Sequence, residues 1–293
     1  IPSPANGINL SSSQFSDWEL DKQKIIETLV GLGFNEIYSN SLISDAEASQ
    51  YGDLEQMIAT LNPLTKDMTT LRPSLLPGFL KACSYNKNRN AKGLRFFELG
   101  NVFFKDEQGT FHKGIGEQTH VIIGLAGQKH EDHWQSPSSK YTFMDLKSSV
   151  QSLWVSLRLD HKIKEKLEGN NSLHYYIGKH YIGNLSQVNK SLQTIYDLDE
   201  AVYFAEFNVQ LIHEARRELG VPAFSKIPKY PGIEYDIALV MDKEIAAGTI
   251  EAEINQMGTK LLNKIRIFDV YEGENIPENK KSIAYRMYFL DPK

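Results

Sequence analysis

Several features that mark other classes of protein are missing from this sequence. Its 293 residues include one cysteine, Cys83, so no internal disulfide can form, which is typical of a reducing cytoplasm. No apolar run approaches the roughly 20 residues that a membrane-spanning helix needs. The N-terminus has neither the basic flank nor the apolar core of a secretory signal, and it starts at Ile1 instead of methionine. We therefore expect a cytoplasmic segment, excised from a longer protein and without membrane association.

An excess of basic residues is also missing. Lys and Arg number 32 against 37 Asp and Glu, which gives a formal net charge of −5. Proteins that bind nucleic acid through charge alone usually carry a basic excess. Any RNA contact must therefore be local, depend on shape, or be shared with another chain. The share of hydrophobic residues, 41%, is that of a globular protein, and the length allows one large domain or two ordinary ones.

Helical and extended patterns alternate through the first two-thirds of the chain. Ser16 and Glu19 have the spacing of a capping box, and Gly33 is suited to end a helix, so we predict a helix over 17–32. Pro77 fits the first turn of a second helix. The same criteria predict helices over 141–159 and 210–219, and strands over 36–43, 94–104, 119–127, 173–184 (a hairpin) and 201–209.

A cluster of prolines then predicts a linker at 216–232. After it the patterns predict a strand, a helix and two strands, over 233–241, 247–257, 261–271 and 282–290. The ferredoxin-like β-α-β-β-α-β motif needs one more helix and one more strand than this. We therefore expect the domain at 233–293 to be incomplete at its C-terminus.

Three groups of residues carry a family resemblance. They are NPLTKDM at 62–68 with LRPSLLPG at 71–78, LRFFELGNVF at 94–103, and near the end DIALV at 236–240, IFDVYEG at 267–273 and KKSIAY at 280–285. In this order the groups resemble the C-terminal part of the β subunits of bacterial-type phenylalanyl-tRNA synthetases. The last group is similar to that family's ferredoxin-fold anticodon-binding domain.

The resemblance implies an α+β fold with two domains. Residues 1–215 would be an inactive copy of the class II synthetase core, an antiparallel sheet with flanking helices, and 233–293 a truncated ferredoxin-like anticodon-binding domain. The family assembles as an (αβ)₂ heterotetramer in which the α subunit joins phenylalanine to its tRNA with ATP and Mg²⁺. The resemblance thus implies a non-catalytic part of this ligase, with no cofactor of its own, that scaffolds the α subunit and contacts the anticodon.

The residues themselves favour inactivity. A class II site needs arginines where the phosphate charge of ATP develops. Arg95 and Glu98 are similar to one such element, but the usual spacing is Arg-x-Glu, and the run at 201–207 has neither glycine nor arginine. We predict no catalytic residue, and we interpret Arg95 as part of a salt bridge on a sheet edge.

The anticodon contacts of the family match three positions in the last domain. Asp269 and Tyr271 lie two apart on a predicted strand and so share a face, and Ser282 begins the next strand. An exposed aromatic ring can stack on an unpaired base, and a carboxylate with a hydroxyl can read its edge. We therefore expect these three residues to bind the anticodon. Weaker candidates, for phosphate contacts, are Lys280, Lys281 and Arg286.

The helix at 17–32 falls where class II synthetases have their dimerisation helix. We expect Trp18, Ile25 and Leu29 to contact the α subunit. Alternatively, the apolar side chains of this helix could cover only the sheet of its own domain. His130 and His133 lack a further pair of ligands, so we predict a polar loop and no metal site.

Two other functions are compatible with parts of the sequence. A class II-like adenylate-forming enzyme would bind ATP by itself. A free-standing RNA-binding module would bind tRNA without an α subunit.

Overall fold

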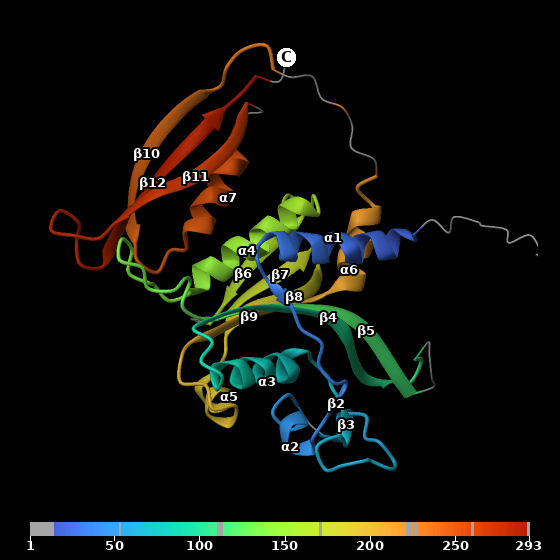
Figure 1. The fold of residues 1–293 in the computed structure, drawn as a ribbon. Coiled ribbons are helices and arrows are strands. Elements are labelled where there is room, and N and C mark those ends of the chain that lie inside the picture. The colour runs from blue at the N-terminus through green and yellow to red at the C-terminus, as the bar shows by residue number, and fades with distance from the viewer. Residues whose placement is uncertain are drawn as a thin grey trace, which may run out of the picture. The chain divides into compact units, whose positions relative to one another are not determined.

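The computed structural model describes residues 15–52, 54–109, 114–169, 172–220, 224, 228–258 and 261–291. Two separate bodies of secondary structure make up the chain, divided between Gly220 and Val221. Figure 1 shows a sheet covered by helices in the first unit and a smaller sheet with one helix in the second.

A seven-stranded sheet organises the first unit, in the spatial order β1-β4-β5-β9-β8-β7-β6. The bounds are β1 (Asn35–Glu36), β4 (Gly93–Asp106), β5 (Gly114–Gly127), β6 (Ile163–Glu168), β7 (Ser172–Ile177), β8 (His180–Gln187) and β9 (Val202–Asn208). Neighbouring strands are antiparallel, except that the short β1 runs parallel to β4. The predicted antiparallel sheet is confirmed, with one parallel pair added at its edge.

Helices cover both faces of this sheet because its strands are apolar on both faces. On one face lie α1 (Asp17–Gly31), α4 (Phe143–Ser156) and α6 (Val209–Arg217), and on the other α3 (Leu76–Lys87) and α5 (Lys190–Ile195). Side chains alternate along β5, so Val121 and Ile123 pack under the first group of helices and Ile122 packs under the second.

Local sequence signals set where α1 begins and ends. The hydroxyl of Ser16 accepts the Glu19 amide at 3.3 Å, and the Glu19 carboxylate accepts the Ser16 amide at 2.9 Å, so the predicted capping box is confirmed. Gly33 follows the helix with a φ of 81°, a conformation that residues with a Cβ rarely adopt.

The predicted strand at 36–43 is wrong as a single element. The segment forms β1 and, after a break, β2 (Leu42–Ile43), which pairs with β3 (Thr70–Leu71) in a separate small sheet. Two polar side chains explain the break: the side-chain Oδ1 of Asn40 accepts the Leu42 amide at 2.9 Å, and the Ser39 hydroxyl donates to Glu98 at 2.5 Å. The short elements α2 (Asp45–Ala48) and η1 (Leu54–Gln56) follow, and the sequence patterns did not predict them.

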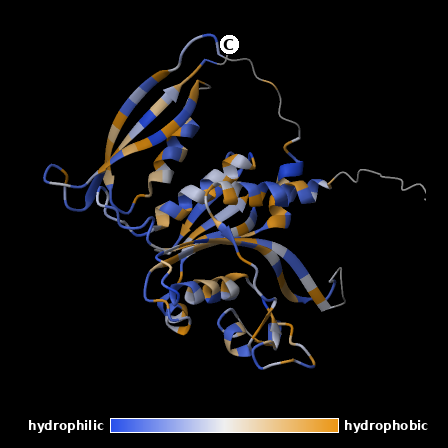
Figure 2. Cartoon of the chain, in the orientation of Figure 1, coloured by the Kyte–Doolittle hydropathy of each residue, from blue (hydrophilic) through white to orange (hydrophobic). Residues whose placement is uncertain are grey.

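The second unit has the predicted order of one strand, one helix and two strands. Its elements are β10 (Ile233–Asp242), α7 (Ala247–Met257), β11 (Leu262–Tyr271) and β12 (Lys280–Phe289), and the sheet order is β10-β12-β11 with all pairs antiparallel. Hydrophobic and hydrophilic residues alternate along these strands (Figure 2), as expected for a sheet with one covered face.

The helix α7 covers only part of that face. Ile250 and Ile254 of the helix pack on the buried Ile283 and Tyr285 of β12. Towards the start of β10 the same face forms an open apolar depression, lined by Ile233, Tyr235, Ile237, Leu261, Met287 and Phe289. In neither unit do the described residues include a helix that is both long enough and apolar enough to cross a bilayer.

Candidate nucleic-acid interface

The face of the second unit's sheet that points away from α7 carries the predicted anticodon-binding residues. Directly paired residues of antiparallel strands share a face. Ile283 and Tyr285, which are buried under α7, pair with Val270 and Ile267 of β11. The alternate residues of β12, which include Ser282 and Arg286, therefore lie on the opposite face, which we call the open face.

All three predicted contacts lie on the open face. Tyr271 pairs directly with Ser282, and Asp269 pairs with Ala284, the next open-face residue of β12. The Tyr271 side chain is 45% exposed. The structure therefore brings a ring, a hydroxyl and a carboxylate together in adjacent positions.

A β-bulge in β11 is what turns Asp269 and Tyr271 towards the open face. Ile265 and Ile267 pack with the α7 core, so strict alternation would place residues 269 and 271 under α7 as well. The register shifts between Ile267 and Asp269, which inserts Phe268 as an extra residue. The sequence patterns gave no sign of this bulge.

The bulge also exposes Phe268, which the sequence analysis did not single out. The residue is 45% exposed, and the Arg286 guanidinium lies over its ring, 4.9 Å from the ring centroid. Arg286 is held in turn by Asp236 of β10, through two hydrogen bonds of 2.8 Å. Hydrogen bonding to this guanidinium lowers the pKa of Asp236 below its ordinary value, so the carboxylate stays ionised.

The three predicted phosphate contacts each have a partner inside the unit. Arg286 pairs with Asp236, and Lys280 lies 3.8 Å from Asp242. Lys281 donates to the Lys243 carbonyl at 2.8 Å. None of these cations is free to meet a phosphate without losing that contact.

Two other cations on the open face have no ion-pair partner among the described residues. Lys264 and Arg266 of β11 pair with Tyr288 and Arg286 of β12, which puts both on the open face. Neither makes an ion pair with any residue that the structure describes. Their alternation with the buried-side Ile265 and Ile267 was the sequence signal that could have identified them.

In the first unit, the interpretation of Arg95 as a salt bridge on a sheet edge is wrong. Residues three apart on a strand point to opposite faces, so Arg95 and Glu98 do not meet. Arg95 donates to the Leu32 carbonyl and lies over the Phe34 ring at 4.9 Å, and it makes no ion pair within the described residues. β4 is also not an edge here, because β1 pairs with it.

Glu98 instead forms a buried ion pair with Arg72. Arg72 Nη1 lies 2.7 Å from Glu98 Oε1, and the two side chains are 3% and 1% exposed. Arg72 also donates to the Asn101 carbonyl and to the Ser39 hydroxyl, at 2.9 and 2.8 Å. Both charged groups are thereby engaged by partners within the chain.

The helix α3 closes this face of the sheet. Gly124 of β5 lies directly under Phe79, and a Cβ at position 124 would come within 2.1 Å of the ring. Glu206 of β9 accepts hydrogen bonds from the two residues just before the helix, from the Ser74 hydroxyl at 2.6 Å and from the Leu75 amide at 3.1 Å. On this face of the sheet, Gly124 and Glu206 are therefore covered or bound by α3 and the residues just before it.

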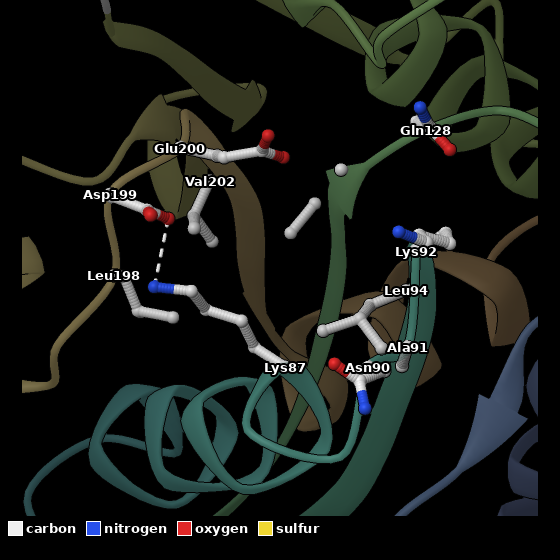
Figure 3. A pocket seen from close by; sticks show the side chains of 12 residues that line it. Lys87, Asn90, Ala91, Lys92, Leu94, Gln128, Leu198, Asp199, Glu200 and Val202 are labelled. Atoms are coloured by element: carbon white, nitrogen blue, oxygen red, sulfur yellow. Dashed lines mark ion pairs between the residues drawn. The ribbon is translucent and has the colours of Figure 1, made fainter. Parts of the chain in front are cut away.

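A small cavity of about 270 Å³ remains beside the C-terminal end of α3. Figure 3 shows Lys87 paired with Asp199 at its rim, at a distance of 2.8 Å. Glu200 pairs with Lys140 at 2.9 Å. Both acids of the rim are thus neutralised, and we assign no ligand to this cavity.

The other sequence candidates are local features. His130 and His133 lie in the polar loop between β5 and α4, and the described residues contain no group of three His, Cys, Asp or Glu that could hold a metal ion. Cys83 is fully buried in α3, and burial raises the pKa of its thiol, which disfavours the reactive thiolate.

The predicted interface residues on α1 have different surroundings. Ile25 and Leu29 are fully buried in the unit's own core, so in this structure neither side chain can touch a second chain. Trp18 is partly buried, with its ring 5.3 Å from that of His213. The apolar side chains that α1 does present to solvent are Leu20 and Val30, which are 48% and 54% exposed.

Comparisons with known proteins agree with this arrangement. Residues 1–209 match the family model described as the phenylalanyl tRNA synthetase beta chain CLM domain, and 228–293 match the ferredoxin-fold anticodon binding domain. The phenylalanine–tRNA ligase β subunit of Bacillus licheniformis is 31% identical over 100% of this chain and 37% of its own length. That of Bacteroides thetaiotaomicron is 32% identical over 96% of this chain and 36% of its own length.

A more distant relative shares part of the fold. Pyrrolysyl-tRNA synthetase from Desulfitobacterium hafniense superimposes with a TM-score of 0.53 at 15% identity, over 69% of this chain and 70% of that chain. This likeness shows a shared fold and nothing more. Over the β subunits, by contrast, the chain spans a little more than a third of their length. Because residues 1–209, more than half of the chain, match the family model, the chain belongs to the phenylalanyl-tRNA synthetase β chain family.

Proposed function

We propose that this chain is a non-catalytic part of a phenylalanine–tRNA ligase β subunit, and that its open face binds the anticodon of phenylalanine tRNA. The observation that carries the proposal is the placement of Asp269, Tyr271 and Ser282 side by side on an uncovered sheet face. The match of 228–293 to an anticodon-binding domain supports it.

The open face offers a separate group for each part of a nucleotide. The Tyr271 ring would stack on an unpaired base, while Asp269 would accept hydrogen bonds from a base edge and Ser282 would complete the contact. Lys264 and Arg266 are free to meet the backbone phosphates. This local pair of cations reconciles RNA binding with a net charge of −5.

In this proposal the first unit is a scaffold for the α subunit in an (αβ)₂ enzyme of the cytoplasm. The α subunit would bind ATP and Mg²⁺ and carry out the ligation, and this part of the β subunit would hold no cofactor. The covering of the sheet by α3 supports a non-catalytic role, because Glu98 and Glu206 are already engaged by the chain. The exposed Leu20 and Val30 of α1 are our candidates for the contact with the α subunit.

Binding of phenylalanine tRNA, measured by fluorescence anisotropy with and without the α subunit, tests the proposal. Loss of one stacking ring typically costs 1–3 kcal/mol, so Tyr271→Ala should weaken binding roughly 5- to 150-fold. The double variant Lys264→Met, Arg266→Met should weaken it and lower the salt dependence, by about one unit of slope per phosphate contact.

Lys281→Met is the matched control, because it removes a charge that already has a partner within the unit. Affinity unchanged by Tyr271→Ala and by the double variant would contradict the proposed site. Equal affinity with and without the α subunit would instead favour a free-standing RNA-binding module.

A further inference from the structure

The bulge in β11 creates a second flat surface on the open face, beside the site proposed above. The Arg286 guanidinium lies over the Phe268 ring, 4.9 Å from the ring centroid. The two hydrogen bonds from Arg286 to Asp236 fix the plane of the guanidinium before any ligand arrives. The side chains are 45% and 43% exposed, so the pair keeps a surface towards solvent.

The charge of this pair is largely neutralised, which distinguishes it from a phosphate site. Arg286 has Asp236 at 2.8 Å and Glu234 at 3.6 Å. A guanidinium held in this way is better suited to stack on a flat ring than to bind a second anion. Of the two cations of the face without an ion pair among the described residues, Arg266 lies directly opposite Arg286, and Lys264 lies opposite Tyr288, further from Tyr271.

The register of the sheet sets the distance between the two aromatic positions. Phe268 is the extra residue of the bulge, and Tyr271 lies three residues after it on β11, or roughly 10 Å along the strand at about 3.4 Å per residue. Bases stacked as in a helix are about 3.4 Å apart. A single ring system cannot reach both positions, so two bases that occupied them would be separated from each other.

The open face carries only short side chains between the two aromatic positions. Ala284 lies midway between Ser282 and Arg286, and its partner on β10 is Ala238. Neither side chain extends beyond Cβ, while Asp269 borders this floor on the other side. An extended strand of RNA could therefore cross from Tyr271 to Phe268 without meeting a large side chain.

We propose that Phe268 and Arg286, positioned by Asp236, form a second stacking site that takes a different unpaired base from the one on Tyr271. This inference rests on the proposed function, since it assigns the neighbouring part of the same RNA loop. The occupant is an unpaired base of single-stranded RNA.

The test uses the full chain and a short RNA stem–loop with the anticodon sequence of phenylalanine tRNA. Versions of the stem–loop in which each loop base in turn is replaced by an abasic residue show which base each ring contacts. Phe268→Leu should weaken binding of the intact stem–loop roughly 5- to 150-fold, the range for loss of one stacked base. With one particular abasic stem–loop, Phe268→Leu and the parent chain should bind with equal affinity, because the base that stacks on Phe268 is already missing. The base whose removal abolishes the effect of Tyr271→Ala should be a different one.

A second variant, Arg286→Lys, keeps the charge but loses the planar group, and it should show dependence on the same base as Phe268→Leu. Val270→Ala is the matched control, because Val270 is an exposed apolar residue of the same strand that shares a face with Ile283, opposite the open face, and it should leave binding unchanged. Melting temperatures establish that each variant is folded.

The outcomes separate the two proposals. If Tyr271→Ala weakens binding but Phe268→Leu does not, or weakens it equally for every stem–loop, the second site is overturned and the first stands. If both rings depend on the same base, the second site is likewise overturned. If the stem–loop does not bind, or Tyr271→Ala has no effect, the proposed anticodon site fails and the inference fails with it.

Discussion

At the scale of single residues, Arg72 and Glu98 show how the covered face of the first unit is held. Each charged group has lost almost all contact with water and depends on the other and on Ser39 and Asn101. The attraction within such a pair roughly offsets the cost of desolvating it, but removal of one member leaves an uncompensated buried charge.

We predict that Arg72→Met lowers the free energy of unfolding by about 3–5 kcal/mol, because Glu98 would remain buried without its partner. Urea unfolding monitored by tryptophan fluorescence measures the change. The control is Lys147→Met, which removes one member of a partly exposed pair with Glu165 and should cost no more than about 1 kcal/mol. Equal effects of the two substitutions would contradict this account.

The open face shows why some residue-level predictions could be made and others could not. Asp269 and Tyr271 were placed on one face by their spacing, and the structure places them so. Which face they share depends on the bulge at Phe268, which follows from strand pairing and has no local pattern in the sequence. Spacing alone also could not show that Glu98 would pair with Arg72, 26 residues away.

At the scale of elements, prediction succeeded where the signal is local. The capping residues of α1 and the proline at the start of α3 act within one helical turn, and both helices begin where those residues predict. The strand predicted over 36–43 is interrupted because Ser39 is bound by Glu98 of another strand. A contact of that kind cannot be read from the segment itself.

The two sides of α1 lead to a prediction about the partner subunit. Leu29→Asp should unfold the first unit, since it would bury a charge in the core, whereas Val30→Asp should leave the melting temperature within a few degrees of the parent. If α1 contacts the α subunit through its exposed side, Val30→Asp should also reduce co-elution with the α subunit in size-exclusion chromatography.

Glu27→Ala, another exposed change on α1, controls for a general effect of altering the helix. Full co-elution of the Val30→Asp variant would exclude this side of α1 as the contact. The comparison is informative only because the buried and exposed positions are adjacent in sequence.

At the scale of the whole molecule, each hydrophobic core lies within one of the two units. All three tryptophans of the chain, Trp18, Trp134 and Trp154, belong to the first unit. Tryptophan fluorescence therefore reports on the unfolding of the first unit alone, while far-ultraviolet circular dichroism reports on both.

We predict that the two units unfold separately, so the two signals should give different urea midpoints for the full chain. A chain shortened to residues 1–220 should keep the fluorescence midpoint of the full chain, because its core is complete. A shift of that midpoint on truncation would show that the second unit stabilises the first. Coincident transitions in the full chain would contradict separate unfolding.

The partly covered sheet of the second unit has a consequence for work with the protein in solution. Within the described residues, β10 pairs on one side only, with β12, so its other side offers a row of backbone donors and acceptors ten residues long. Next to that row lie the exposed side chains of Ile233 and Tyr235. A strand edge of this kind is a template for pairing between molecules, so concentrated samples should form reversible oligomers through it, and affinities for RNA should depend on protein concentration.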